Sequence, residues 1–163
     1  MASGSSTEKP GHRTLRDGRR SLTGQYYHII TCTAERRRVF ANFHCGREVV
    51  RSIRRLQAEG IARSIAFVVM PDHLHWLMQL HDRKSLSVCV GSMKSFATRS
   101  MIAKNLRRGP VWQEGFMDRA IRREEDLLPV ARYIVANPLR AGLVEHIGEY
   151  PLWDSIWLED PAP

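Results

Sequence analysis

The chain has 163 residues, enough for one domain of ordinary size, and 43% of them are hydrophobic, which excludes wholesale disorder. Lys and Arg outnumber Asp and Glu by 25 to 17, which gives a net charge of +8. An excess of this sign indicates a polyanionic partner, with nucleic acid favoured over an anionic membrane. No apolar run approaches the roughly 20 residues of a membrane-spanning helix. The polar N-terminus predicts no secretory signal.

The cysteines indicate a reducing compartment. Cys32, Cys45 and Cys89 are odd in number, lie far apart and form no CxxC pair. This pattern argues against a disulfide framework and against a cysteine zinc site. We therefore expect a cytoplasmic protein, associated with the nucleoid if its partner is DNA.

The positive charge is concentrated in the first three quarters of the chain. Residues 1–24 carry a net charge of +3, residues 35–63 carry +5 and residues 91–123 carry +6, whereas residues 124–163 carry −6. A merely solvated basic face is one interpretation, but arginines clustered in three separate segments favour an anion-binding groove. Residues 1–24 are rich in Gly, Ser, Thr and Arg, which predicts a flexible basic arm before a single domain over 25–163.

Hydrophobic periodicity and turn residues predict the elements in chain order. They are a strand over 26–33, a helix over 46–59 closed by Gly60, a strand over 61–70, a turn at Pro71-Asp72, a strand over 73–80, a helix from Ser85 to the stop at Gly109-Pro110, an irregular segment or short strand over 111–122, a helix from 124 to about 137, a short helical turn over 139–144 and an extended segment over 151–157. This order predicts an α+β fold, a ferredoxin-like antiparallel sheet with helices packed on one face.

His73 and His75 stand two residues apart on a predicted strand, so both side chains leave the same face of the sheet. Two imidazoles on one strand face are well placed to bind one metal ion. Two polar residues on a solvated face remain an alternative. His81 shares their parity but lies where the strand should end, and we interpret it as a surface histidine.

Tyr133 and Asn137 are spaced i, i+4 on the last long helix and lie beside its apolar stripe of Leu127, Ala131 and Ile134. Such a border position suits groups that face a cleft, and a phenol becomes a useful nucleophile when a cation polarises its target. Two structural alternatives stay open. Tyr133 can be an ordinary border residue, and Asn137 before Pro138 can be a helix N-cap.

Several segments in this order resemble the REP-associated tyrosine transposases, single-tyrosine transposases with the His-hydrophobe-His (HUH) nuclease fold. The segments are MPDHLHWLMQL, GPVWQEGFMDRAIR, YIVANPLRAGLV and YPLWDS, and the resemblance covers about residues 24–157. It implies Mg²⁺ or Mn²⁺ on His73 and His75, with Asn137 as a third ligand where related insertion-sequence transposases carry glutamine. It also implies that Tyr133 attacks single-stranded DNA and forms a 5′-phosphotyrosine and a free 3′-OH. The implied partners are hairpins of repetitive extragenic palindromes.

Basic residues and one aromatic residue are the candidates for DNA contact. They are Arg36, Arg37, Arg38, Lys94, Arg107, Arg108, Trp112, Arg119 and Arg122. Trp112 can instead be packed in the core, and Arg119 and Arg122 can instead pair with the acids at 124–126.

The first interpretation is therefore a metal-dependent single-strand DNA endonuclease and strand transferase. A non-catalytic nucleic-acid-binding domain and a water-using metal-dependent phosphodiesterase are the alternatives. We expect no membrane association and no small-molecule cofactor, and a monomer is favoured over a dimer.

Overall fold

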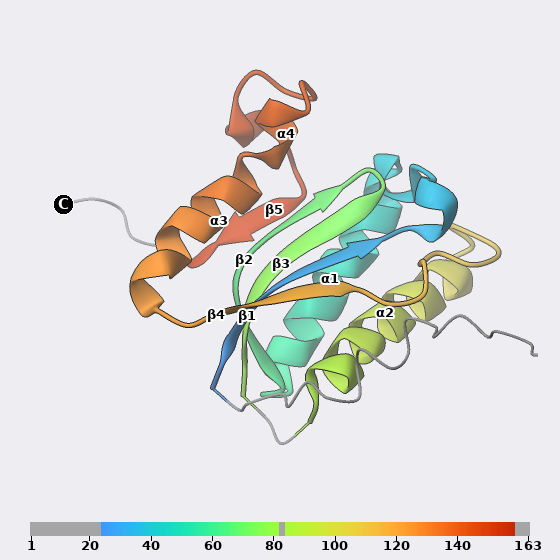
Figure 1. The fold of residues 1–163 in the computed structure, drawn as a ribbon. Coiled ribbons are helices and arrows are strands. Elements are labelled where there is room, and N and C mark those ends of the chain that lie inside the picture. Colours follow the sequence, from blue (N-terminus) through green and yellow to red (C-terminus); the bar gives the residue numbers. More distant parts are fainter. Residues whose placement is uncertain (1–23, 82–83, 159–163) are drawn as a thin grey trace, which may run out of the picture.

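Five strands form one antiparallel sheet in the order β4–β1–β3–β2–β5 (Figure 1). The computed structural model describes residues 24–81 and 84–158, so the predicted arm over 1–24 lies almost entirely outside the described residues. The elements are β1 (Tyr26–Cys32), η1 (Ala34–Arg36), η2 (Val39–Ala41), α1 (Phe43–Ala58), β2 (Ala62–Met70), β3 (His73–Leu80), α2 (Leu86–Ala103), β4 (Met117–Ile121), η3 (Glu124–Asp126), α3 (Leu127–Val135), α4 (Asn137–Arg140), η4 (Ile147–Glu149), β5 (Trp153–Ser155) and η5 (Ile156–Leu158).

The predicted α+β class is confirmed. The order β1-α1-β2-β3-α2-β4, with β1 and β3 between the other two strands, is the ferredoxin-like arrangement, and β5 extends the sheet beyond β2. The turn at Pro71-Asp72 joins β2 to β3 as an antiparallel hairpin in which Met70 lies opposite His73. The segment over 111–122 contains β4 and, before it, irregular chain. This chain forms a bridge between Trp112 and Thr33, just after β1, and Gln113 N donates to the Cys32 carbonyl oxygen at 2.9 Å.

Local capping sets the helix boundaries. The Asn42 side chain accepts a hydrogen bond from the backbone N–H of His44 at 2.9 Å, so α1 begins at Phe43, three residues before the predicted start. The Ser85 hydroxyl accepts from Val88 N at 3.2 Å and opens α2 as predicted. Gly60 has a φ of +71° just after α1, the left-handed conformation that ends a helix most easily with glycine.

The sheet is covered on both faces, which differs from the prediction that all helices share one face. α1 and α2 pack as predicted against one face, where Leu74, Trp76 and Met78 of β3 are fully buried (Figure 1). α3 packs instead against the opposite face, where its apolar stripe meets Leu77 of β3 and residues of β2. β2 and β3 carry apolar residues on both faces at this point, so the second face also needed a helix to cover it.

Glu48 joins α1 to α2 through a buried carboxylate. Its side chain is 3% exposed and accepts hydrogen bonds from Ser100 Oγ at 2.5 Å and Lys104 Nζ at 2.7 Å, and it also pairs with Arg51. Burial alone would raise the pKa of this carboxyl. The hydrogen bonds from Lys104 and Ser100 and the charges of Arg51 and Lys104 outweigh burial, so the pKa of Glu48 lies below its usual value.

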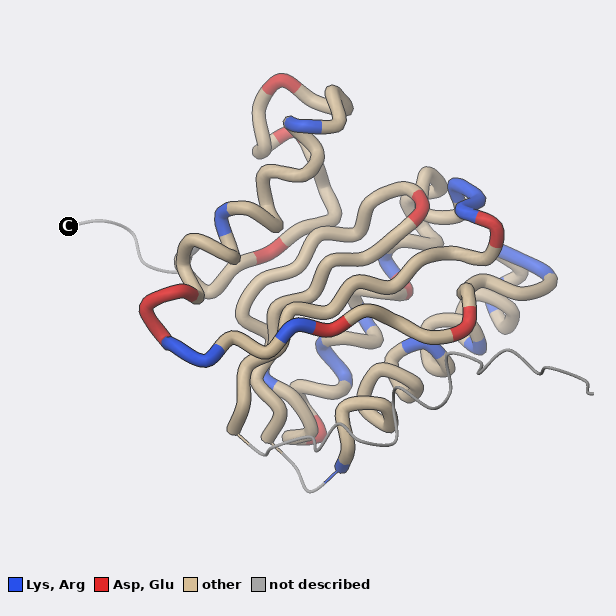
Figure 2. The backbone as a smooth tube through the Cα atoms, in the orientation of Figure 1, with Lys and Arg blue, Asp and Glu red and all other residues tan. Residues whose placement is uncertain are grey.

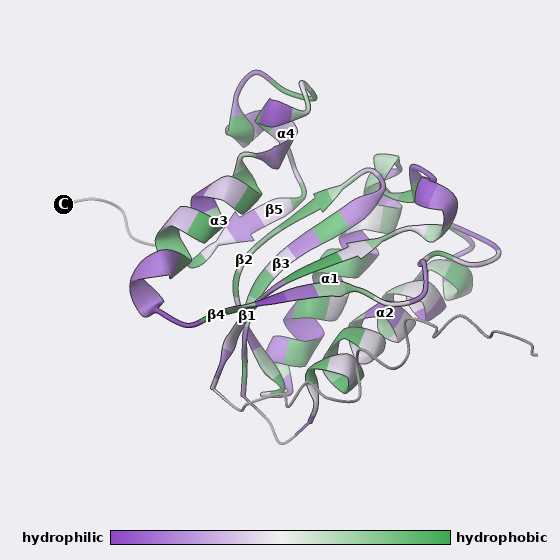
Figure 3. Cartoon of the chain, viewed as in Figure 1, coloured by the Kyte–Doolittle hydropathy of each residue, from purple (hydrophilic) through white to green (hydrophobic). Residues whose placement is uncertain are grey.

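Hydropathy and charge follow this layering. The connecting segments at 35–38 and 122–126 are coloured hydrophilic, whereas the strands at the centre of the sheet are mainly hydrophobic (Figure 3).

Cys32, Cys45 and Cys89 are all free thiols, in agreement with the expectation of no disulfide. Within 24–81 and 84–158, no helix combines the length and the apolar character needed to cross a membrane.

Candidate active site

His73 and His75 lie side by side on the face of β3 that α1 and α2 leave uncovered. Their ring centroids are 5.0 Å apart with the planes at 71°, and Leu74 between them is buried on the opposite face. The prediction that both imidazoles leave the same face is therefore confirmed. α3 packs on this same face, next to the histidines.

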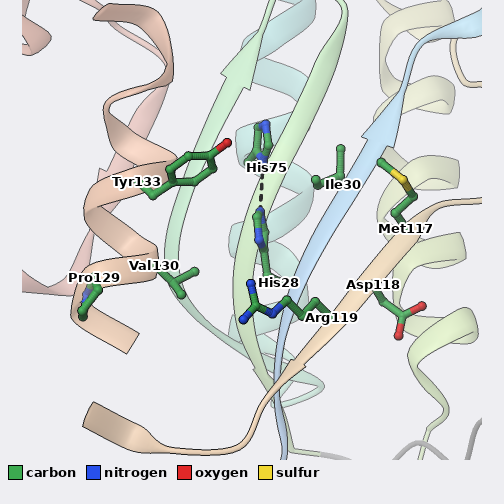
Figure 4. A pocket seen from close by; sticks show the side chains of 9 residues that line it. All are labelled: His28, Ile30, His75, Met117, Asp118, Arg119, Pro129, Val130 and Tyr133. Carbon is green, nitrogen blue, oxygen red and sulfur yellow. Dashed lines mark hydrogen bonds between the residues drawn. The ribbon is translucent and has the colours of Figure 1, made fainter. Parts of the chain in front are cut away.

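Each of these imidazoles uses Nδ1 for a hydrogen bond within the protein. His73 Nδ1 lies 2.7 Å from Asp72 Oδ1, and His75 Nδ1 lies 2.9 Å from His28 Nε2 on β1 (Figure 4). Neither Nε2 atom has a hydrogen-bond partner among the residues that the structure describes. Metal-binding histidines commonly have one nitrogen held by another protein group in this way, which leaves the other nitrogen for the ion.

Electrostatics favour neutral imidazole at His75. Burial is the largest influence and lowers the pKa of His75 to about 3, and the neighbouring His73, His28 and Arg140 act in the same direction. A neutral ring keeps a nitrogen lone pair at neutral pH, and only that form binds a metal ion.

Asp72 is held as an anion beside His73. Burial alone would raise the pKa of the Asp72 carboxyl, but the hydrogen bond from His73 and the charges of His73 and Arg36 outweigh it and hold the pKa below its usual value. Arg36 Nε lies 3.1 Å from Asp72 Oδ2, and Arg36 Nη1 lies 2.8 Å from Cys32 Sγ. This chain of contacts connects the loop after β1 to His73.

Tyr133 and His75 line one cavity of about 500 Å³ between α3 and the sheet. Figure 4 shows the Tyr133 ring extending from α3 toward His75, with its hydroxyl group on the side of the histidine. His28 and Arg119 line the same cavity from β1 and β4. Tyr133 is 55% exposed, and the stripe of Leu127, Ala131 and Ile134 beside it is buried as predicted. The cavity therefore combines an accessible phenol with a metal-competent imidazole.

Arg140 holds Tyr133 from the following helix. The guanidinium carbon lies 4.0 Å from the centre of the phenol ring, and Arg140 Nη2 donates to the Tyr133 carbonyl oxygen at 2.7 Å. The cation–π contact and the hydrogen bond together restrict the rotation of the ring.

Asn137 does not cap a helix N-terminus, so that alternative is wrong. The N-cap position of α4 is Ala136, and Asn137 is the first residue of the helix. The Asn137 side chain instead donates from Nδ2 to the carbonyl oxygen of Ile134 at 2.9 Å and of Tyr133 at 3.4 Å, at the end of α3. Its Oδ1 has no hydrogen-bond partner within the described part of the chain. Asn137 and His73 are not among the residues that line the cavity.

Three of the candidate DNA-contact residues follow β1. Arg36, Arg37 and Arg38 are exposed at the end of the sheet that also carries the Pro71-Asp72 turn (Figure 2). Arg37 pairs with the exposed Glu35 at 2.6 Å. Of the three, Arg36 places positive charge beside His73 through its ion pair with Asp72.

The other candidates are divided between surface and interior. Arg108, Arg119 and Arg122 are exposed, and of these only Arg119 lines the cavity. Lys94 Nζ donates to the carbonyl oxygens of Gln113 at 3.1 Å and Gly115 at 2.5 Å, so it holds the irregular segment before β4.

Trp112 and Arg107 are partly buried. The Trp112 ring packs on Phe40 with ring centroids 5.1 Å apart, which agrees with the packing alternative for this residue. Trp112 Nε1 and Arg107 Nε are both buried without a hydrogen-bond partner in the described residues, and Arg107 Nη2 donates to the Pro110 carbonyl oxygen at 3.3 Å.

Sequence reasoning missed His28, Asp72 and Arg140. The signal for Asp72 was its position directly before His73, because a carboxylate beside a metal-binding histidine often orients it. The signal for Arg140 was its i, i+7 spacing from Tyr133, which returns to the same side after two helical turns. Side chains alternate between the two faces along β1, so His28 points away from the face on which Tyr27 and Ile29 are buried. Only the pairing of β1 with β3 places His28 against His75.

The side chains available at this site suit a divalent cation, but they would fill only part of its coordination shell. Within 24–81 and 84–158, no group of three or more His, Cys, Asp or Glu side chains is arranged to hold a metal ion. The chain offers two imidazole Nε2 atoms and, near the nucleophile, an amide oxygen. A cation bound this way would keep positions for water or for a phosphate oxygen.

Comparison with known proteins identifies relatives of this site and fold. A family model described as IS200-like transposase matches residues 21–137. A REP-associated tyrosine transposase of Escherichia coli K12 is 32% identical over 88 residues, which are 53% of this chain and 50% of the relative. A Haemophilus influenzae protein given the same name provisionally is 31% identical over 98 residues, which are 54% of this chain and 56% of the relative. The chain thus spans about half the length of the curated relatives that it matches.

A solved structure of a REP-associated tyrosine transposase bound to a REP hairpin has the same fold. The two superpose with a TM-score of 0.69 at 20% identity, over 83% of this chain and 79% of that one. The family model covers well over half of the chain, including β1, the two histidines and Tyr133. The chain belongs to the IS200-like transposase family.

Proposed function

We propose that this protein is a metal-dependent single-strand DNA endonuclease and strand transferase that acts on hairpin-forming repetitive palindromic DNA. The observation that carries the proposal is the shared cavity of Tyr133 and His75, because it joins a nucleophile to a metal-competent imidazole. The relative of known structure is bound to a REP hairpin, and this supports a hairpin as the substrate.

His73 and His75 would hold Mg²⁺ or Mn²⁺ through Nε2, with Asn137 Oδ1 as the third ligand. The cation supplies Lewis-acid polarisation of a phosphate oxygen when it is bound. The hydrogen bonds on the far side of each ring support this assignment, since Asp72 and His28 already occupy both Nδ1 atoms. The hydrogen bonds from Asn137 Nδ2 to the end of α3 leave its oxygen as the available end of the amide.

Tyr133 is the proposed nucleophile. Its hydroxyl oxygen attacks the phosphorus of the scissile phosphodiester, the bond from phosphorus to the tyrosine oxygen forms and the bond to the 3′-oxygen breaks. The phenol loses its proton and the leaving 3′-oxygen gains one, so the products are a 5′-phosphotyrosine and a free 3′-OH. Because a phosphodiester replaces a phosphodiester, a second strand can be joined by the reverse reaction without ATP.

The exposed arginines are the proposed DNA contacts. Arg119 faces the cavity, and Arg36 to Arg38 stand at the histidine end of the sheet, so both positions suit phosphates on either side of the scissile bond. Arg108 and Arg122 are exposed and would extend this surface. Lys94, Arg107 and Trp112 would act on DNA chiefly by shaping the segment before β4, given their internal contacts. We propose action as a monomer on chromosomal DNA in the cytoplasm.

The test uses labelled single-stranded hairpins from the host's own repeats, incubated with the protein and Mg²⁺ or Mn²⁺. We expect a protein–DNA adduct that survives SDS electrophoresis and depends on the metal. Metal-dependent cleavage without an adduct would favour a water-using phosphodiesterase. Hairpin binding without cleavage in either metal would favour a non-catalytic binding domain, and both results would contradict the proposal.

A further inference from the structure

We propose that His28 is a positioning residue that fixes the ring proton of His75 on Nδ1 and so turns the Nε2 lone pair of His75 toward the cation. This inference rests on the proposed function, because it assigns a role to His28 in the same site. His28 lies on β1, 47 residues before His75, and is not adjacent to the His-hydrophobe-His segment in the sequence.

The contact between the two rings is direct and geometrically restricted. His28 Nε2 and His75 Nδ1 are 2.9 Å apart, and the rings are stacked with centroids 5.2 Å apart and planes at 29°. A hydrogen bond between two nitrogens needs one N–H and one lone pair. The bond therefore couples the tautomer of His75 to that of His28.

Only one direction of this hydrogen bond leaves His75 able to bind a metal. If His75 donates from Nδ1, its Nε2 carries a lone pair and can be a ligand. If His28 donates from Nε2, a neutral His75 carries its proton on Nε2 and cannot bind there. The chain therefore needs His28 as the acceptor.

The neighbouring His73 has the same arrangement. Its Nδ1 lies 2.7 Å from the Asp72 carboxylate, which only accepts hydrogen bonds, so a neutral His73 carries its proton on Nδ1 and keeps the Nε2 lone pair. With His28 as the acceptor for His75, both imidazoles would present Nε2 to the same cation.

The backbone makes His28 a rigid support. β1 lies inside the sheet, paired with both β3 and β4, and Leu77 is the partner of His28 on β3. Pairing on two sides fixes the backbone at His28, and stacking on His75 restrains the His28 ring. A positioning group on such a strand keeps the ligand geometry fixed while substrate enters and leaves.

The first test measures the tautomer in the full-length, metal-free protein. Long-range ¹H–¹⁵N NMR correlations of the histidine rings, assigned with His75→Ala, show which nitrogen of His75 is protonated. We expect the Nδ1–H form in the unmodified protein. In His28→Phe, which keeps a ring but has no acceptor, we expect a shift to the Nε2–H form, and in His28→Gln we expect the side-chain oxygen to restore Nδ1–H. An Nε2–H form of His75 in the unmodified protein would overturn the proposal.

The second test measures Mn²⁺ affinity by EPR detection of free Mn²⁺. We expect His28→Phe to weaken binding by roughly 10–100-fold and His28→Gln to recover most of the affinity. His44→Phe, at an exposed position in the first turn of α1, is the matched control and should bind Mn²⁺ normally.

His75→Ala distinguishes failure of the positioning role from failure of the proposed function. If His75→Ala binds Mn²⁺ as well as the unmodified protein, the metal site of the proposed function fails. If His75→Ala no longer binds Mn²⁺ while a folded His28→Phe retains it, only the positioning role of His28 is overturned.

Discussion

Replacing Glu48 with Gln removes the buried negative charge that joins α1 to α2. A hydrogen bond to a charged group contributes about 1.5–3 kcal/mol and is about twice as strong as a neutral one, so the Ser100 hydroxyl bond weakens by about 1 kcal/mol when its acceptor becomes an amide. The Lys104 and Arg51 side chains are 47% and 56% exposed, so solvent screens each pair to roughly 0.2–1 kcal/mol. The expected cost is therefore about 1.5–3 kcal/mol of unfolding free energy.

Thermal unfolding followed by circular dichroism measures this cost. For a chain of this size the midpoint should fall by roughly 3–12 °C. Glu59→Gln is the matched control: its carboxylate is 42% exposed and pairs with Arg55 at 2.9 Å, so it should cost less than about 1 kcal/mol. An effect of Glu48→Gln no larger than that of Glu59→Gln would refute the reasoning.

The pH dependence of the same variant has a definite sign. The pKa of Glu48 is lowered in the folded protein, so its stabilising contribution is complete above the usual carboxyl pKa of about 4.3 and disappears as the pH falls through the lower folded value. The stability difference between the unmodified protein and Glu48→Gln should be constant near pH 7 and should shrink in acid. A difference that grows below pH about 4 would contradict the assignment.

The remaining predictions concern the site and its substrate. His73→Ala and His75→Ala should each abolish cleavage while hairpin binding, which depends on charge and shape, is retained; a variant that still cleaves would remove that histidine from the mechanism. Changing residues 36–38 from Arg to Ala should flatten the log–log salt dependence of hairpin binding by about 0.7 for each phosphate that the arginines no longer neutralise, and a fall in affinity at unchanged slope would show that they contact no phosphate. Arg140→Ala should slow cleavage about tenfold at unchanged hairpin affinity, since one cation–π contact and one hydrogen bond no longer hold the Tyr133 ring; an unchanged rate would show that the ring needs no support.

The parts of the fold that the sequence predicted well depend on local physics. The strand over 73–80 was predicted to the residue, because the Pro71-Asp72 turn marks its start and the mainly apolar run that follows is typical of a buried strand. The start of α1 was missed by three residues because the capping contact of Asn42 was not recognised. The placement of α3 on the second face depended on which apolar residues of β2 and β3 were left uncovered, and helical periodicity alone does not supply that information.

The residues of the candidate site were predictable from local sequence, but their arrangement in space was not. The sequence motifs contained His73, His75 and Tyr133, and spacing within each strand or helix indicated which side chains share a face. The cavity itself depends on long-range pairing, which brings His28 within 2.9 Å of His75 through the register of β1 and β3. Composition offered no way to separate a packed Trp112 from a base-stacking one, because that depends on whether Phe40 covers the ring.

The most direct test of the proposed chemistry is the mapping of the covalent DNA adduct in the unmodified protein and in Tyr133→Phe. This substitution removes one oxygen from a half-exposed ring, so the fold and hairpin binding should be unaffected. Tyr26→Phe, Tyr27→Phe and Tyr150→Phe are the controls: the first two lie on β1, and the Tyr150 hydroxyl donates to the Val69 carbonyl oxygen at 2.5 Å, with burial raising its pKa to about 12. We predict an adduct on Tyr133 in the unmodified protein and in all three controls, and none in Tyr133→Phe. An adduct that persists in Tyr133→Phe and maps to another tyrosine would contradict the assignment of the nucleophile.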